Sequence, residues 1–223
     1  AVTATLAPAF SAELGLSAGD LGLLAGAYFL GFALTQLPLG RALDRYGPRR
    51  VLLVLLALAV IGCAAFASAR QFVSLALARA VIGVGLSACL MAPLTAFRRG
   101  FDPVAQLRAN SWMLMSGSLG MVASTLPVQW LLPTLGWRGL FWGVAGMLML
   151  SMVAVRLLVP ADPPPDIARP GEGGGYATIW AHPVFRSLAP LAFFLYGGMI
   201  AVQTLWAGPW LVRVCGQAPE RAA

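Results

Sequence analysis

Long apolar segments alternate with short polar ones along almost the whole of this 223-residue chain. Each apolar segment is close to the roughly 20 residues that an α-helix needs to cross the hydrocarbon core of a bilayer. Complete segments of this kind occupy residues 21–39, 51–69, 72–97, 111–132, 140–159 and 188–212. Residues 1–10 form a partial segment at the start. The pattern predicts an all-α membrane protein with six complete spans and a stub.

Composition argues against a soluble protein. Hydrophobic residues make up 59% of the chain and charged residues 10%, which leaves too little polar surface for a soluble domain of this length. The formal net charge of +7 would suggest nucleic acid in a soluble protein. Here all 15 basic residues are Arg, and most lie in short segments between apolar ones. We therefore expect the lipid bilayer, and no nucleic acid, as a partner.

The distribution of Arg over the polar segments predicts the topology. If the segments alternate between the two sides, one side receives Arg41, Arg45, Arg49, Arg50, Arg98, Arg99, Arg108, Arg156, Arg169 and Arg186. The other side receives Arg70, Arg138, Arg213 and Arg221. Cytoplasmic loops carry the excess of Arg and Lys in membrane proteins. The segment at 40–50 is therefore expected in the cytoplasm.

The composition changes after residue 159, at the end of the sixth span if the partial one at 1–10 is counted. Residues 160–175 are rich in Pro and Gly. Proline has no backbone N–H to donate, and glycine costs too much conformational entropy to order. We expect an amino-terminal six-helix bundle with a truncated first helix at 1–160, a cytoplasmic central linker at 161–187, and the seventh helix with the start of a second bundle at 188–223. Because the chain begins without Met inside an apolar segment, we also expect a fragment of a longer protein.

The charged segment between the first two complete spans carries the most informative residues. These are Gly40, Asp44, Arg45, Gly47, Arg49 and Arg50. The two glycines permit the positive φ of a sharp reversal, and the Asp44 carboxylate can accept from Arg45 or Arg49 or lie against a helix N-terminus. Such a cluster can hold two parts of a protein together. The alternative is a solvated turn whose charges only set the topology.

Two further motifs accompany the charged segment. Residues 79–85 place Arg79 ahead of two glycines within the fourth segment, and residues 136–141 read Gly-Trp-Arg-Gly-Leu-Phe before the sixth. The charged segment resembles the loop between helices two and three of the major facilitator superfamily, although Pro48 stands where that family commonly has a basic residue. The other two motifs resemble that family's fourth-helix motif and the turn before its sixth helix.

The resemblance implies both a fold and a function. It implies the six-helix bundle of that family plus the first helix of the second bundle, in a bacterial inner membrane with the charged loop and the linker cytoplasmic. It implies secondary active transport of a small solute by alternating access, whether as uniporter, symporter or antiporter. The family's Asp at the position of Asp44 lies at the cytoplasmic seam between the bundles, where its contacts hold the outward-open state.

Arg79 is the charge that the sequence places deepest in a span. It lies about 10 Å along the fourth helix, where exposure to lipid would be expensive, so it should face the bundle or a wet cavity. The alternative is snorkelling to the outer interface. We expect Arg79 on the substrate or proton pathway, and a single buried cation favours an anionic or neutral solute. Further pathway candidates are Tyr28, Ser118, Gln203 and Trp206.

Pairs of small residues indicate close helix packing. They occur as Gly22 with Gly26, Gly83 with Gly85, and Gly139 with Gly143. Small residues four apart, such as Gly22 with Gly26 and Gly139 with Gly143, let helix backbones approach each other in membranes. We interpret these six glycines as packing residues.

Other classes of protein fit the sequence less well. A retinal photoreceptor needs a Schiff-base Lys, which this chain lacks, and an intramembrane protease needs an embedded Ser/His pair or two Asp. We expect no enzyme, no cofactor and no metal site. The complete spans contain no acidic residue, which leaves proton coupling open. A noncatalytic membrane scaffold or an inactive half-transporter is the alternative function.

Overall fold

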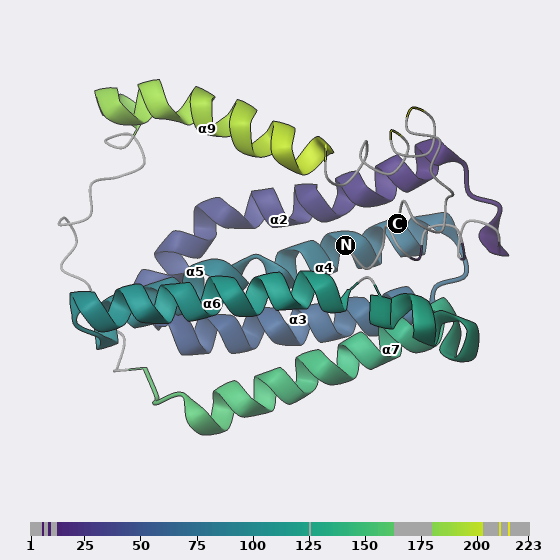
Figure 1. The fold of residues 1–223 in the computed structure, drawn as a ribbon, viewed down its shortest axis with the longest axis horizontal. Coiled ribbons are helices and arrows are strands. Elements are labelled where there is room, and N and C mark those ends of the chain that lie inside the picture. Colours follow the sequence, from purple (N-terminus) through teal and green to yellow (C-terminus); the bar gives the residue numbers. More distant parts are fainter. Residues whose placement is uncertain are drawn as a thin grey trace. The chain divides into compact units, whose positions relative to one another are not determined.

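The structure, a computed structural model, describes residues 6, 9, 13–124, 126–162, 180–202, 210 and 214. All regular elements within these residues are helices (Figure 1). They are α2 (Ala18–Tyr46), α3 (Pro48–Ser68), α4 (Phe72–Leu86), α5 (Ala88–Gly100), α6 (Pro103–Ala123), α7 (Leu126–Leu158) and α9 (Pro183–Ala201). The chain divides into two compact units, of which Val2–Ile167 contains α2 to α7 and Ala168–Ala223 contains α9. The predicted all-α class is confirmed.

Four helices in the described part of the chain are long and apolar enough to cross a membrane. They are Gly19–Tyr46, Pro48–Ser68, Phe72–Gly100 and Pro127–Leu158. They overlap the predicted spans at 21–39, 51–69, 72–97 and 140–159, although the last helix begins well before residue 140. The helices α6 and α9 overlap the predicted spans at 111–132 and 188–212 without meeting the same measure. Most of the predicted stub at 1–10, and residues 163–179 of the predicted linker, lie outside the described residues.

The predicted limits of the span at 111–132 are wrong. Helix α6 begins at Pro103, because the Asp102 carboxylate accepts the backbone N–H groups of Val104 and Ala105, each at 2.9 Å. This is an N-cap followed by Pro at the first helical position, a strong start signal that the charge of Arg108 obscured. The helix ends at Ala123.

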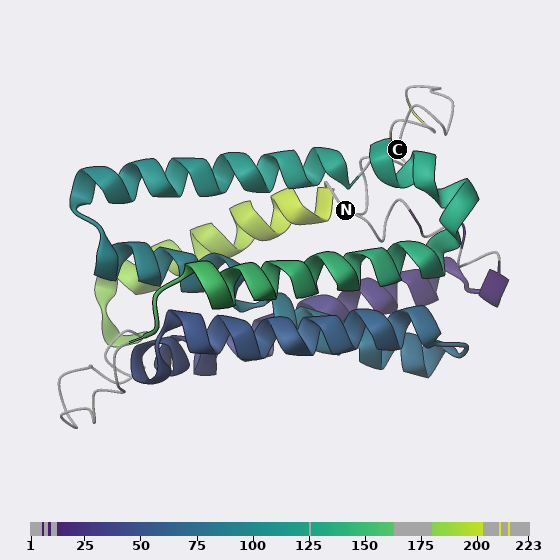
Figure 2. The ribbon, with the colours of Figure 1, turned by 90° about the horizontal axis from the view of Figure 1, so that it is seen from below.

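Two hydrophobic clusters hold α2, α3, α4, α5 and α7 together. The larger one is built around Phe66 of α3, whose ring centroid lies 4.3 Å from that of Phe141 in α7. The smaller one, at the other end of α3, includes Leu39, Leu43 and Val51. Figure 2 shows α3 and the green part of α7 side by side. These helices therefore pack against one another along part of their apolar surface.

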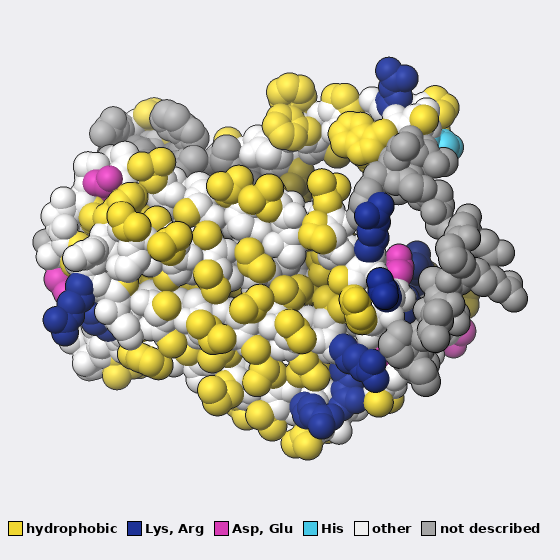
Figure 3. Space-filling model, turned by 180° about the vertical axis from the view of Figure 1, so that it is seen from behind, with side chains coloured by type: hydrophobic (Ala, Val, Ile, Leu, Met, Phe, Trp, Pro, Cys, Tyr) yellow, Lys and Arg dark blue, Asp and Glu magenta, His cyan; other side chains and the backbone are white. Residues whose placement is uncertain are grey.

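Much apolar surface stays outside these clusters. On α2, Leu23, Leu30 and Leu34 are 63%, 60% and 67% exposed, and α6 has no buried residue. In Figure 3, hydrophobic side chains cover the middle of the visible surface, whereas most Arg side chains lie toward its ends. Soluble monomers rarely expose apolar areas of this extent, so the distribution fits a surface immersed in lipid or covered by further helices.

Candidate gate and pathway residues

The charged segment is two helix ends joined by one residue, and not the loop predicted for 40–50. Helix α2 continues to Tyr46, Gly47 makes the turn, and Pro48 opens α3. Gly47 has φ +85°, a conformation that residues with a Cβ rarely adopt. Gly40 lies inside α2 without a positive φ, so the expectation that it helps to make the reversal is wrong. The one-residue connection brings the polar ends of α2 and α3 close together.

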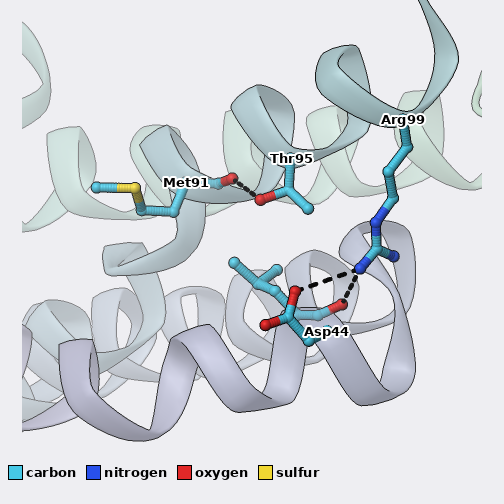
Figure 4. Close-up of polar contacts among 5 residues, drawn as sticks. Asp44, Met91, Thr95 and Arg99 are labelled. Carbon is cyan, nitrogen blue, oxygen red and sulfur yellow. Dashed lines mark hydrogen bonds and ion pairs between the residues drawn. The ribbon is translucent and has the colours of Figure 1, made fainter. Parts of the chain in front are cut away.

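Asp44 pairs with a residue that the sequence did not suggest. Its Oδ1 lies 3.4 Å from Nη2 of Arg99, near the end of α5, and the same nitrogen donates to the Leu43 carbonyl oxygen at 3.4 Å (Figure 4). Arg45 or Arg49 was the predicted partner. Arg45 instead lies over the ring of Tyr46, with its guanidinium carbon 5.4 Å from the centroid. The ion pair therefore joins the ends of α2 and α5.

The Asp44–Arg99 pair is well exposed to solvent. The side chain of Asp44 is 72% exposed and that of Arg99 is 38% exposed. Exposed ion pairs of this kind contribute about 0–1 kcal/mol to stability. Arg99 also lies in the last turn of α5, where a cation is favoured by the helix dipole. The fold thus depends little on this pair, and the Asp44 carboxylate stays accessible.

Asp162 caps the N-terminus of α3 from a distant part of the sequence. Its Oδ2 accepts the backbone N–H of Arg50 at 2.8 Å, and its Oδ1 accepts that of Arg49 at 3.3 Å. Gly47 occupies the N-cap position and has no side chain to do this, and a Cβ there would overlap the Asp162 carboxylate. A carboxylate at a helix N-terminus satisfies two unpaired donors and opposes the dipole.

The Arg49 side chain makes the reciprocal contact. Its Nη2 donates to the carbonyl oxygen of Arg156 in the last turn of α7. The start of α3 and the end of α7 therefore satisfy each other's free backbone groups. Sequence reasoning missed Asp162, although an acidic residue just after a span and a helix that starts Gly-Pro-Arg-Arg without its own cap are a usable signal.

Replacing Asp162 with alanine is expected to destabilise α3 and its contact with α7. Loss of an N-cap acceptor costs about 0.5–2 kcal/mol, which lowers the thermal midpoint by a few degrees. Asp162→Asn, which keeps an acceptor oxygen but not the charge, should lose less. Thermal unfolding of the purified full-length protein in detergent measures both. Equal midpoints for Asp162→Ala and the wild type would rule out a capping role.

Arg79 lies inside the bundle. Its side chain is 7% exposed, and its guanidinium carbon lies 4.8 Å from the ring centroid of Phe66 and 5.5 Å from that of Phe141. Arg79 belongs to α4 and the two rings to α3 and α7, so three helices enclose the cation. Aromatic faces attract a buried guanidinium electrostatically. The side chain does not snorkel to the interface, which was the alternative drawn from the sequence.

Among the other predicted pathway residues, Tyr28 packs against the large hydrophobic cluster that surrounds Arg79, whereas Ser118 is not part of that cluster. Tyr28 of α2 is half-buried and its ring stacks on Phe32, with centroids 6.3 Å apart. Ser118 is exposed on α6, where its hydroxyl donates to the Leu114 carbonyl oxygen of the same helix. Gln203 and Trp206 lie outside the described residues.

Glycines line the closest helix contacts. A Cβ on Gly83 would overlap the carbonyl oxygen of Tyr28 in α2, and one on Gly85 would overlap Ala59 in α3. Gly31 and Gly62 were not selected from the sequence, and both also face α4 closely. By contrast, Gly22, Gly26 and Gly143 have nothing within 4 Å of a built Cβ, and Gly139 is near only Leu135 of its own helix.

Gln36 connects α2 to a break in the fourth predicted span. Ser87 separates α4 from α5, and its hydroxyl donates to the Val84 carbonyl oxygen at 2.6 Å. The Gln36 side chain donates to the Ser87 carbonyl oxygen at 3.3 Å, across the helix contact. This bond satisfies a backbone acceptor where the helical ladder is interrupted.

Among the described residues, no three His, Cys, Asp or Glu side chains form a group that could hold a metal.

Comparison with known proteins supplies a family for this arrangement. The family model described as Major Facilitator Superfamily matches residues 1–217. A probable L-galactonate transporter of Escherichia coli is 27% identical over 61% of this chain and 31% of its own. A cis,cis-muconate transport protein of Acinetobacter baylyi is 28% identical over 67% of this chain and 36% of its own. A chloramphenicol resistance protein of Streptomyces lividans is 32% identical over 71% of this chain and 40% of its own. The chain spans about a third of the length of these curated relatives.

Proposed function

Because the chain belongs to the major facilitator superfamily, we propose that it carries a small solute across a bacterial inner membrane by alternating access. The multi-pass helices supply the membrane-spanning part, and a gradient of solute or of an ion drives the movement. The charged ends of α2, α3 and α5 lie in the cytoplasm in this proposal, as does the segment after α7. Arginine is concentrated on that side, in keeping with the positive-inside rule.

The observation that carries the gating part of the proposal is the position of Asp44. Its carboxylate is bound loosely by Arg99, is largely exposed, and lies at the junction of α2 and α3. We infer that this carboxylate contacts the second set of helices when the cytoplasmic side is closed and loses that contact when it opens. An accessible charge with a small role in the fold suits such a reversible contact.

The substrate is proposed to be a small anionic or neutral organic molecule. Arg79 is the charged side chain that the described bundle buries, and its positive potential disfavours organic cations. Two of the relatives are named for L-galactonate and cis,cis-muconate, which are organic acids, and a third for chloramphenicol resistance. These names extend to this chain only as candidates for a first panel of solutes.

Uptake by the reconstituted full-length protein tests the proposal. Proteoliposomes would be given a panel of radiolabelled sugar acids, dicarboxylates and neutral aromatic amides, with and without an imposed proton gradient. Saturable uptake of one class supports the transporter, and its response to the gradient decides proton coupling. Folded protein that moves no member of the panel under either condition would favour a scaffold or an inactive half-transporter.

Substitution of Asp44 by asparagine is expected to lower transport without unfolding the protein. The thermal midpoint should stay within about 2–4 °C of wild type, since the exposed ion pair contributes little. Uptake should fall severalfold, and a cysteine placed at Thr95 should react faster with a membrane-impermeant thiol reagent from the cytoplasmic side. Arg99→Gln leaves the Asp44 carboxylate in place and should therefore lower uptake less than Asp44→Asn does, and the adjacent Arg98→Gln serves as the matched control. Wild-type uptake and labelling in Asp44→Asn would contradict the gate.

A further inference from the structure

The Gly-Trp-Arg motif lies at the end of the bundle opposite Asp44. Helix α3 runs from Pro48 at the charged end to Ser68, so Ala69 marks the opposite end. At that end α7 is interrupted at Gly136, with φ +64° and ψ 172°. The interruption redirects the backbone, so that residues 137–158 form a separate helical stretch beside α3. Trp137 and Arg138 are thus the first residues of that stretch.

Trp137 and Arg138 both bind the carboxylate of Glu13. The indole Nε1 of Trp137 donates to Oε2 at 2.5 Å, and Nη1 of Arg138 donates to Oε1. Nη2 of Arg138 also donates to the Ala69 carbonyl oxygen at 3.0 Å. The Arg138 guanidinium carbon lies 4.2 Å from the Trp137 ring centroid. Three chain segments, before α2, after α3 and within α7, therefore meet at one carboxylate and one guanidinium.

The surroundings of Trp137 connect these polar contacts to the hydrophobic core. Trp137 is 4% exposed, and its ring packs edge-on against Phe66, with centroids 5.9 Å apart. Phe66 belongs to the large hydrophobic cluster that also encloses Arg79. A buried indole needs a partner for its N–H, and Glu13 supplies it. The position of the Trp137 ring in the core is thus tied to a carboxylate at the bundle end.

We propose that Glu13, Trp137 and Arg138 form an end clamp, which fastens the segment before α2 to α3 and α7 and which opens when Glu13 is protonated. A protonated carboxyl loses its ion pair with Arg138 and accepts only weaker hydrogen bonds, because it no longer carries a negative charge. Opening releases Nη1 of Arg138 and the Trp137 N–H together, while Nη2 of Arg138 keeps its bond to the Ala69 carbonyl oxygen. In the topology proposed above, the end clamp lies on the outer side, where strong external acid would reach it.

The hydrogen-bond donors of the end clamp shift the pKa of Glu13, and this pKa decides the pH range in which the clamp opens. The hydrogen bond from Trp137, and then that from Arg138, lowers the pKa of Glu13 from its ordinary value of 4.5. A carboxyl whose folded-state pKa is lowered stabilises the protein above the ordinary value, and this stabilisation is lost as the pH falls through the lowered value. Arg138 is the described charge that binds Glu13, Asp20 is engaged with Ser17 at the start of α2, and Arg70 follows Ala69. The clamp is therefore closed near neutral pH.

Thermal unfolding of the full-length protein in detergent, from about pH 7 down to about pH 3.5, tests the end clamp. At pH 7, Glu13→Gln and Arg138→Gln should each lower the midpoint by about 2–4 °C, and the double variant should lower it no further than either single one. Trp137→Phe keeps the ring but not the N–H donor, and should reproduce part of this loss. Below pH 4.5 the gap between wild type and Glu13→Gln should narrow as the pH falls through the lowered pKa of Glu13.

Two results would overturn the end clamp. The first is a midpoint for Glu13→Gln that equals wild type at pH 7. The second is a gap between the two proteins that is the same at pH 7 and at pH 3.5, because a purely structural contact would not depend on the charge of Glu13. Hydrogen exchange of the peptide that contains Trp137 adds an independent reading, with faster exchange expected in Glu13→Gln at pH 7.

Discussion

Replacing Gly83 with leucine is expected to prevent the bundle from folding. A Cβ at this position would overlap the carbonyl oxygen of Tyr28 and crowd the backbone nitrogen of Phe32 in α2. These are backbone atoms, which cannot rotate away as a flexible side chain can. Inserting atoms into a packed core costs about 1–3 kcal/mol even where neighbours can shift, and a leucine would force α2 and α4 apart. Size-exclusion profiles of the detergent-solubilised protein should show aggregation.

Gly83→Ala separates close packing from other effects of glycine. In a helix interior, alanine is favoured over glycine by about 1 kcal/mol, so the substitution would be stabilising if space were available. We expect a net loss at Gly83 because the overlap outweighs this gain. Gly26→Ala in α2 is the matched control, since nothing lies within 4 Å of its built Cβ. Equal thermal midpoints for Gly83→Ala and Gly26→Ala would show that α2 and α4 are not in close contact at Gly83.

Replacing Arg79 with methionine is expected to reduce transport about tenfold or more while the protein stays folded. Taking a charge out of water is expensive, and exchange of the buried Arg79 for an apolar side chain of similar volume removes this cost. Methionine also packs well against aromatic rings, here Phe66 and Phe141. The positive potential inside the bundle is lost, however, and with it the proposed attraction for solute. Initial uptake rates in proteoliposomes, with thermal midpoints measured alongside, separate the two effects.

Arg79→Lys serves as the charge-preserving control. Lysine keeps the positive charge but lacks the planar guanidinium that lies over the two rings. We expect transport between that of wild type and that of Arg79→Met. If Arg79→Met transports like wild type, the arginine has only a packing role. If both variants unfold, Arg79 holds α3, α4 and α7 together and the assignment to the solute pathway fails.

The sequence located the membrane spans because their signal is local. A run of about 20 apolar residues is enough to define a transmembrane helix, whatever that helix contacts. The interior position of Arg79 could be predicted for a similar reason, since exposure of the charge to lipid is expensive for any arrangement of neighbours. Helix limits were predicted less well. The start of α6 at Pro103 is set by the Asp102 cap, which is a local signal in the sequence. The charge of Arg108 made this part of the helix look like a loop.

The spacing of glycines in the sequence does not predict which of them lie in helix contacts. The pairs Gly22 with Gly26 and Gly83 with Gly85 were both interpreted as packing residues, yet only the second pair lies against neighbouring backbones. Gly31 lies in an equally close contact with Ala80 and was not selected. Spacing marks a face on which a helix can be approached. Which face is approached depends on the crossing of α2, α3 and α4, which is a property of the assembled bundle.

What the sequence determined by itself was therefore the membrane class, the main spans, the charged junction and the burial of Arg79. The tertiary structure decided the partners of the charges: Arg99 for Asp44, Asp162 for the start of α3, and Glu13 for Arg138. The partners in these pairs are 55, 112 and 125 residues apart in the chain. Several arginines could have satisfied each carboxylate equally well by charge alone. Only the packing of the helices brings one particular donor within hydrogen-bond distance.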